Sequence, residues 1–229
     1  MYEKKVLIRN ENERISGMFR ILQDIAGEAS EQVGLGGDEL AEKGLMWVIV
    51  RYDVEFLRMP DSGEMLTMQT WAGPFRHCMS QRNYLAFDAE GDCVLRGAGI
   101  WTVVDYSTRN MVDPGERGIL IAGEHTGEEP PRPLSPQKLP LQKQTEYAVT
   151  DQVLDRNLHM NNTRYFDVAQ DCIGDQTKGL RLSRVQAVFS SEARAGDVLD
   201  ISWGNGQNNW FFQGEKHHEP CFRIGLKYA

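Results

Sequence analysis

The sequence predicts an α+β protein made of two similar halves, each with one long helix wrapped by an antiparallel sheet. Three observations lead to this prediction. A proline-rich stretch divides the 229-residue chain near its middle, an apolar stripe with helical spacing opens each half, and several short strand patterns follow each stripe. A chain of this length can form one large domain or two small ones.

The proline-rich stretch marks the boundary between the halves. Six of the nine prolines fall between Pro114 and Pro140, where glycine and glutamate are also frequent. Proline donates no backbone hydrogen bond, so such a segment is typical of a connector. We therefore expect an N-terminal half at residues 1–114, a linker at residues 115–144 and a C-terminal half at residues 145–229.

Each half opens with a predicted amphipathic helix, because its apolar residues recur at steps of three and four. In the first half these residues are Ile15, Met18, Phe19, Leu22, Ile25, Ala26 and Ala29. In the second half they are Tyr165, Phe166, Ala169, Cys172 and Ile173. Glycines at 34, 36 and 37 end the first helix, and Gly174 or Gly179 ends the second. Asn161, Asn162 or Thr163 is the expected N-cap of the second helix.

Strand patterns separated by turn residues follow both helices. In the first half we expect strands at Trp47–Val54, Met65–Trp71, Arg82–Phe87 and Val94–Val104, with an edge at Asn110–Val112. In the second half we expect strands at Leu182–Ser190, Val198–Trp203, Trp210–Gln213 and Phe222–Tyr228.

A short repeat supports duplication of one unit. Residues 56–66 align with residues 189–199 at a constant offset of 133, matching a phenylalanine, a glycine, an acidic residue and a leucine. Two such units side by side form one continuous sheet with two central helices. The predicted architecture is therefore a tandem, or double, hot-dog fold.

Composition narrows the classes of function. The formal net charge is −8 and the sequence pI is near 5.2, which argues against general binding to nucleic acid or to an anionic membrane. The four cysteines are scattered without metal-ligand spacing, so we expect reduced thiols and no metal or organic cofactor. No apolar run approaches the length of a membrane span, and no signal-peptide pattern is present. We expect a cytoplasmic protein.

The segment from Asp155 to Asn162 concentrates polar side chains just before the second helix. Asp155, Asn157, His159, Asn161 and Asn162 provide five polar groups within eight residues. Unpaired N–H groups at a helix start suit a developing oxyanion, and the positive end of the helix dipole favours a neutral histidine. The first half has no histidine before its helix, so we expect chemistry in the second half alone.

Glu192 adds a carboxylate at the position that Met59 occupies in the first copy, again at an offset of 133. A solvated surface glutamate is the alternative interpretation of this residue.

These features resemble a known family over nearly the whole chain. The first half contributes Trp47–Arg51, Gly63-Glu64, Thr70-Trp71, Ile100–Asp105 and Thr108-Arg109, the linker contributes Lys138-Leu139-Pro140, and the second half contributes Leu154-Asp155-x-Asn157-x-His159-x-Asn161-Asn162-x-x-Tyr165. In these segments the chain resembles the acyl-acyl carrier protein (ACP) thioesterases of plants and bacteria. The resemblance implies a double hot-dog fold and hydrolysis of fatty acyl-ACP thioesters.

The resemblance also implies a catalytic network made of Asp155, Asn157, His159 and Glu192. Plant members carry a cysteine after the glutamate, where this chain has Ala193, and no cysteine of this chain lies in either motif. A thiol nucleophile is therefore not expected.

For substrate binding we expect Asn161 and Asn162 to assist beside the catalytic residues. We expect Met18, Leu22 and Trp71 of the first half to shape the acyl pocket, with a plain core role as the alternative for each.

In the mechanism expected from these residues, His159 and Glu192 position and deprotonate a water, and Asn157 holds the thioester carbonyl or the water. Backbone N–H groups at the helix start stabilise the oxyanion, and Asp155 orients the network. Attack by a carboxylate to give an acyl-enzyme anhydride is the competing mechanism.

Other functions remain open at this point: hydrolysis of acyl-coenzyme A, hydration of an enoyl thioester, or acyl binding without catalysis. An acidic carrier protein would need a local basic patch, for which Arg76, Arg82, Arg181, Arg184 and Arg194 are loose candidates. The duplication supplies the usual hot-dog pair internally, so further dimerisation is left open.

Overall fold

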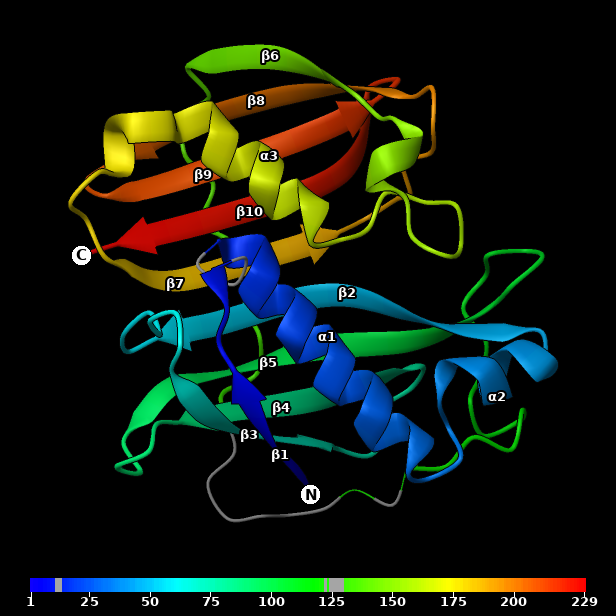
Figure 1. Cartoon of the computed structure of the whole chain (residues 1–229). Helices are drawn as coiled ribbons and strands as arrows, with labels where there is room; N and C mark the ends of the chain where they lie inside the picture. Colours follow the sequence, from blue (N-terminus) through cyan, green and yellow to red (C-terminus); the bar gives the residue numbers. More distant parts are fainter. Residues whose placement is uncertain (11–13, 122, 124–129) are drawn as a thin grey trace.

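The computed structural model describes residues 1–10, 14–121, 123 and 130–229. Its strands form one antiparallel sheet, and helices α1 and α3 lie across the same face of that sheet (Figure 1). This is the arrangement that the sequence predicts.

Both halves follow the same plan of one edge strand, one long helix and a meander of four strands. The first half contains β1 Tyr2–Leu7, α1 Ile15–Glu31, α2 Gly37–Glu42, β2 Leu45–Phe56, β3 Met65–Ala72, β4 Met79–Phe87 and β5 Cys93–Asp105. The second half contains β6 Lys143–Ala148, α3 Arg164–Ile173, β7 Leu182–Phe189, β8 Val198–Gly206, β9 Asn209–Lys216 and β10 Glu219–Tyr228.

The strand order is β1-β3-β4-β5-β2-β7-β10-β9-β8-β6, so the two meanders meet at β2 and β7. This central seam pairs residues 51–55 of β2 with residues 184–188 of β7, and Tyr52 lies opposite Ala187. Each half thus completes the sheet of the other.

The core lies between the helices and the sheet. Phe19 of α1 packs on Phe166 of α3 with ring centroids 4.3 Å apart, and on Tyr52 of β2 at 4.9 Å. All three side chains are fully buried. The predicted apolar stripes are therefore the faces by which the two helices meet each other and the seam.

The repeated turn has the same backbone geometry in both copies. β2 and β7 end, and β3 and β8 begin, at the offset of 133 seen in the sequence. Gly63 and Gly196 have φ values of 90° and 87°, a left-handed conformation that glycine adopts at least cost. In each turn an acidic side chain, Glu64 or Asp197, accepts a hydrogen bond from the backbone three residues earlier.

The described part of the linker crosses the face of the sheet that is remote from the helices. Tyr52 points toward α1, so its neighbour Asp53 points to the opposite face, where its carboxylate accepts a hydrogen bond from the backbone N–H of Leu134. Arg184 donates two hydrogen bonds to the same carboxylate. Residues 122 and 124–129 of the predicted linker lie outside the described residues.

Two elements differ from the predicted boundaries. α2 forms where Gly36-Gly37 was expected only to end a helix, and β6 begins at Lys143, inside the predicted linker. β6 pairs with β8 as the outer edge of the second half, as β1 pairs with β3 in the first.

Candidate active site

The polar segment before α3 forms a tight loop. Leu154 and Met160 make an isolated antiparallel bridge, and the backbone N–H of Asp155 donates to the carbonyl of His159 at 2.8 Å. At the tip, Leu158 has a φ of 61°, in the left-handed region. The carboxylate of Asp155 accepts the N–H groups of Asn157 at 2.8 Å and His159 at 3.4 Å. Asp155 therefore holds the backbone that carries the other two polar residues.

A single backbone hydrogen bond docks this loop against the end of β7. The N–H of Met160 donates to the carbonyl of Ala193 at 2.8 Å. His159 and Glu192, the residues that precede Met160 and Ala193, therefore lie side by side. Nε2 of His159 lies 2.9 Å from Oε2 of Glu192. Glu192 lies three residues beyond the end of β7, in the repeated turn.

Positive side chains surround Glu192. Nη1 of Arg109 lies 3.7 Å from Oε1, and Nη2 of Arg194 lies 3.9 Å from Oε2. The glutamate side chain is 33% exposed, whereas His159 is 6% exposed. The site therefore combines a buried imidazole with a solvent-accessible carboxylate.

The pKa of His159 is lowered from its ordinary value of 6.5. Burial is the largest cause, because it disfavours the charged imidazolium, and the charges of Arg109 and Arg194 act in the same direction. The negative charge of Glu192 opposes them. His159 is thus neutral near pH 7, mainly through burial, whereas the sequence argument relied on the dipole of α3. α3 begins at Arg164, five residues after the histidine.

Arg109 belongs to the Thr108-Arg109 motif, but no local pattern in the sequence places its side chain in the site. The residue adopts a left-handed φ of 60° in the turn after β5, and its guanidinium lies 4.7 Å from the ring centroid of Tyr106. It also contacts the sulfur of Met46. These contacts aim the guanidinium at Glu192, which is 83 residues away in the sequence.

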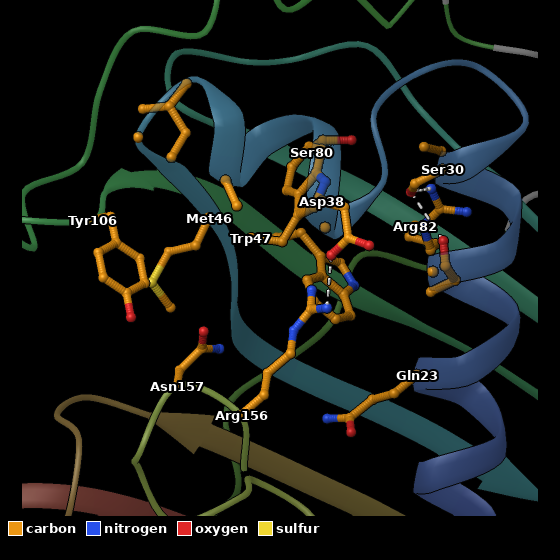
Figure 2. A pocket seen from close by; sticks show the side chains of 18 of the residues that line it. Gln23, Ser30, Asp38, Met46, Trp47, Ser80, Arg82, Tyr106, Arg156 and Asn157 are labelled. Atoms are coloured by element: carbon orange, nitrogen blue, oxygen red, sulfur yellow. Dashed lines mark hydrogen bonds and ion pairs between the residues drawn. The ribbon is translucent and has the colours of Figure 1, made fainter.

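A cavity of about 540 Å³ lies next to the loop, because Asn157 of the loop lines it. Met46 and Tyr106, which both contact Arg109, also line it, and α1 supplies the side chains of Gln23, Ala26 and Ser30 to its wall (Figure 2). Arg156 also lines it and binds Asp38 of α2 at 3.1 Å. The cavity lies mostly in the first half, while the loop that carries Asn157 reaches it from the second half.

Two family models match the chain. Residues 5–114 match the acyl-ACP thioesterase N-terminal domain, and residues 137–220 match the acyl-ACP thioesterase C-terminal domain. The chain belongs to the acyl-ACP thioesterase family.

The sequence identity between this chain and individual acyl-ACP thioesterases is low. The chain is 22% identical over 228 residues to the chloroplastic oleoyl-acyl carrier protein thioesterase 2 of Arabidopsis thaliana, covering 87% of this chain and 61% of that protein. It therefore spans less than two thirds of the length of this relative.

Solved structures confirm the double hot-dog fold. The 12:0-ACP thioesterase of Umbellularia californica superposes with a TM-score of 0.83 at 19% identity, covering 100% of this chain and 96% of that one. An acyl-ACP thioesterase from Bacteroides thetaiotaomicron gives a TM-score of 0.82 at 20% identity, covering 100% and 97%.

The residues predicted to bind substrate fall in two places. Met18 and Leu22 are fully buried in the core, and Trp71 is buried as well. None of these three side chains lines the cavity. Asn161 accepts hydrogen bonds from the backbone N–H and the hydroxyl of Thr163, so it shapes the entry to α3. Asn162 is partly exposed beside it.

In the part of the chain that the structure describes, no cysteine sulfur is hydrogen-bonded to His159 or Glu192. Ala193 is fully buried at the position of the plant cysteine. Cys221 is also fully buried and donates to the carbonyl of Ser191. Burial raises the pKa of Cys172 to about 11 and raises that of Cys93, which keeps both thiols protonated.

Among the described residues, no helix is both long and apolar enough to cross a bilayer. Within the same ranges, no group of three or more histidine, cysteine or acidic side chains is arranged to hold a metal ion.

Two of the arginines suggested for an exposed basic patch do not fit that role. Arg82 is buried in the cavity wall, and Arg184 is bound to Asp53 on the face of the linker. The guanidinium of Arg82 is therefore shielded from an acidic partner protein, and that of Arg184 is held by Asp53 on the face of the sheet remote from the helices.

Proposed function

We propose that this chain hydrolyses fatty acyl thioesters carried on acyl carrier protein, using Asp155, Asn157, His159 and Glu192. The observation that supports this proposal is the pair of His159 and Glu192, 2.9 Å apart, on a loop whose Asn157 lines a cavity of about 540 Å³. A neutral imidazole next to a carboxylate can accept a proton from water, and pockets of this size accommodate small ligands.

In the proposed reaction a water lies against His159 and Glu192 and attacks the thioester carbonyl carbon. The base accepts the proton of the water, the carbon–sulfur bond breaks, and the proton passes to the departing thiolate. General-base catalysis of this kind contributes a factor of about 10² to 10⁴ to the rate. Asn157, which lines the cavity, holds the carbonyl or the water, and Asp155 keeps the loop in place.

Direct attack by water is favoured over attack by the carboxylate. Both oxygens of Glu192 face positive or hydrogen-bonding groups, since Arg109 lies 3.7 Å from Oε1 and His159 lies 2.9 Å from Oε2. Positive and hydrogen-bonding neighbours make the carboxylate of Glu192 a weaker nucleophile. Single-turnover hydrolysis in ¹⁸O-water tests this choice, because label in Glu192 would show an anhydride that water opens at the glutamyl carbon. An anhydride that water opens at the fatty-acyl carbon leaves Glu192 unlabelled, so the mass of the protein in quenched reactions is measured as well to detect an acylated enzyme.

The choice of an acidic carrier protein rests on exposed cations around the catalytic pair. The side chains of Arg156 and Arg194 are 68% and 60% exposed, although the chain carries a net charge of −8. Exposed positive side chains around a binding site accelerate the association of a negatively charged partner, and they make that association sensitive to salt. A cytoplasmic location stays a prediction.

The decisive assay offers the purified protein saturated acyl chains of several lengths on acyl carrier protein and on coenzyme A, and measures the thiol released. We expect turnover, with a higher kcat/KM on the carrier protein that falls as salt is added. Turnover of coenzyme A esters alone would contradict the choice of carrier. A trans-2-enoyl thioester that loses its enoyl absorbance without releasing thiol would indicate hydration, and binding without any turnover would indicate a binding module.

A further inference from the structure

The cavity contains a buried guanidinium. Arg82, on β4, is 8% exposed and belongs to the cavity wall. Its Nη2 donates to the hydroxyl of Ser30 at 3.0 Å, and its Nη1 lies 3.4 Å from the hydroxyl of Thr70. Both partners are neutral side chains, and a guanidinium has five N–H donors to satisfy.

No carboxylate within the described ranges lies in ion-pair distance of Arg82. Other partly buried arginines differ in this respect: Arg58 binds Glu64 and Asp88, and Arg184 binds Asp53. Burial lowers the pKa of Arg82, and the neighbouring phenols of Tyr52 and Tyr84 stay uncharged near pH 7 because burial raises their own pKa values. A buried cation without an anionic partner is costly, so proteins usually pair such a group or use it to bind a ligand.

Other polar groups line the same cavity. Gln23 and Ser30 of α1 contribute an amide and a hydroxyl, and the indole of Trp101 belongs to the wall as well, with its N–H beside the phenol of Tyr84. A cavity built only for a hydrocarbon chain has no use for these donors. In Figure 2, Arg82 and Ser30 lie on the α1 side of the cavity, whereas Asn157 and Tyr106 lie at the opposite end.

We propose that the cavity accepts an acyl chain that ends in a carboxylate, and that Arg82 binds this carboxylate while the thioester lies at Asn157. This inference rests on the proposed thioester hydrolysis, and it specifies the class of acyl group. The carboxylate supplies the missing negative charge, and a planar carboxylate can accept two parallel N–H donors of the guanidinium.

Selectivity follows from the cost of an unpaired charge. A methyl-terminated chain of equal length displaces water from Arg82 and leaves the guanidinium desolvated and unpaired. A site built to bind a polar substrate group discriminates strongly against analogues that lack the group. We expect the carboxylate-terminated chain to have the higher kcat/KM by about tenfold or more.

The experiment compares acyl thioesters in pairs of equal length: hexanoyl with adipoyl, octanoyl with suberoyl, and decanoyl with sebacoyl. The unmodified protein is expected to prefer the carboxylate-terminated member of at least one pair. Arg82→Met is expected to reverse that preference, because it removes the buried charge and keeps a side chain of comparable length. Arg223→Met provides the control, since Arg223 is a partly buried sheet arginine on β10 that does not line the cavity. It is expected to leave the ratio unchanged.

The outcomes separate this inference from the proposed function. Turnover with no preference for the carboxylate in any pair, or a preference for a hydroxyl-terminated chain, overturns the inference and leaves the hydrolase proposal intact. If no thioester is hydrolysed, calorimetric binding of free suberate decides the inference alone: binding that is lost in Arg82→Met supports it, and absence of binding overturns it. The comparison in the unmodified protein needs no variant, so misfolding of Arg82→Met does not leave the question open.

Discussion

Met59 and Glu192 occupy equivalent positions in the two repeated turns, each three residues after the strand that forms the central seam. The side chain of Met59 packs against the hydrophobic core, whereas that of Glu192 lies 2.9 Å from His159. One backbone geometry therefore places a core side chain in the first half and, in the second, the carboxylate that we propose to be catalytic.

Removing either member of the catalytic pair is expected to abolish most activity without unfolding the protein. His159→Ala and Glu192→Gln should each lower kcat by about 10²- to 10⁴-fold, the usual contribution of a general base. Steady-state kinetics measure this loss, and circular dichroism checks the fold. Glu219→Gln, at the exposed first residue of β10, is the control and should retain full activity. Near-normal turnover in either site variant would remove that residue from the mechanism.

The pH dependence of the reaction should follow the lowered pKa of His159. The imidazole must be neutral to accept a proton, so kcat/KM should fall toward acid with a midpoint below 6.5. An acid midpoint above 6.5 would show that the charge of Glu192 outweighs burial.

The same pKa shift affects stability. His159 binds a proton less readily in the folded protein than in the unfolded chain. The free energy of unfolding should therefore decrease as the pH falls below 6.5 and through the lowered pKa of His159. Urea titrations of the protein and of His159→Gln across this range isolate the contribution of the histidine. A pH dependence that is identical in both would contradict the assignment.

Arg109 is expected to act as a positioning residue for Glu192. Arg109→Gln should lower kcat by roughly tenfold and should move the acid limb of the pH profile upward, because the positive charge of Arg109 lowers the pKa of His159. Arg109→Lys should restore part of both effects. Arg117→Gln, at an exposed position in the following turn, serves as the control. A decrease in kcat with an unchanged pH profile would indicate a purely structural role.

The two turn glycines offer a matched pair of variants. Gly63→Ala and Gly196→Ala should each destabilise the fold by roughly 1–2 kcal/mol, because alanine is strained at φ values near 90°. An added methyl group meets no atom within 4 Å at either position, so backbone strain is the expected cause. Only Gly196→Ala should also lower kcat, since its turn carries Glu192. Equal losses of activity in both variants would argue against this separation.

The sequence predicted most of the fold because the repeat and the apolar stripes carry strong local signals. Gly63 and Gly196 are an example, since a shared offset predicted a shared turn and both glycines have the same left-handed conformation. β6 was missed because its side chains are almost all exposed and polar, which leaves no alternating pattern to detect. α2 was missed because it has only six residues and follows two glycines.

The site was predicted less completely, since contacts between distant segments leave no local pattern. The Asp155–His159 motif is dense enough to recognise, but Arg109 reaches Glu192 only through the fold. The acyl pocket shows a similar limit. An apolar stripe on α1 predicts that Met18 and Leu22 are buried, but it does not reveal that the cavity lies against Gln23, Ala26 and Ser30 instead.

The central seam has a consequence for how the two halves can vary. When two identical chains pair through such a seam, every substitution appears on both sides of it. In a single fused chain the partner is always present at high effective concentration, and a change in one half leaves the other half untouched. Under the proposed function, the first half can therefore have Met59 in place of a carboxylate and use its interior to select the acyl group, while the second half carries out the reaction. Joining the halves in one chain thus makes a division of labour available that a symmetric pair cannot reach.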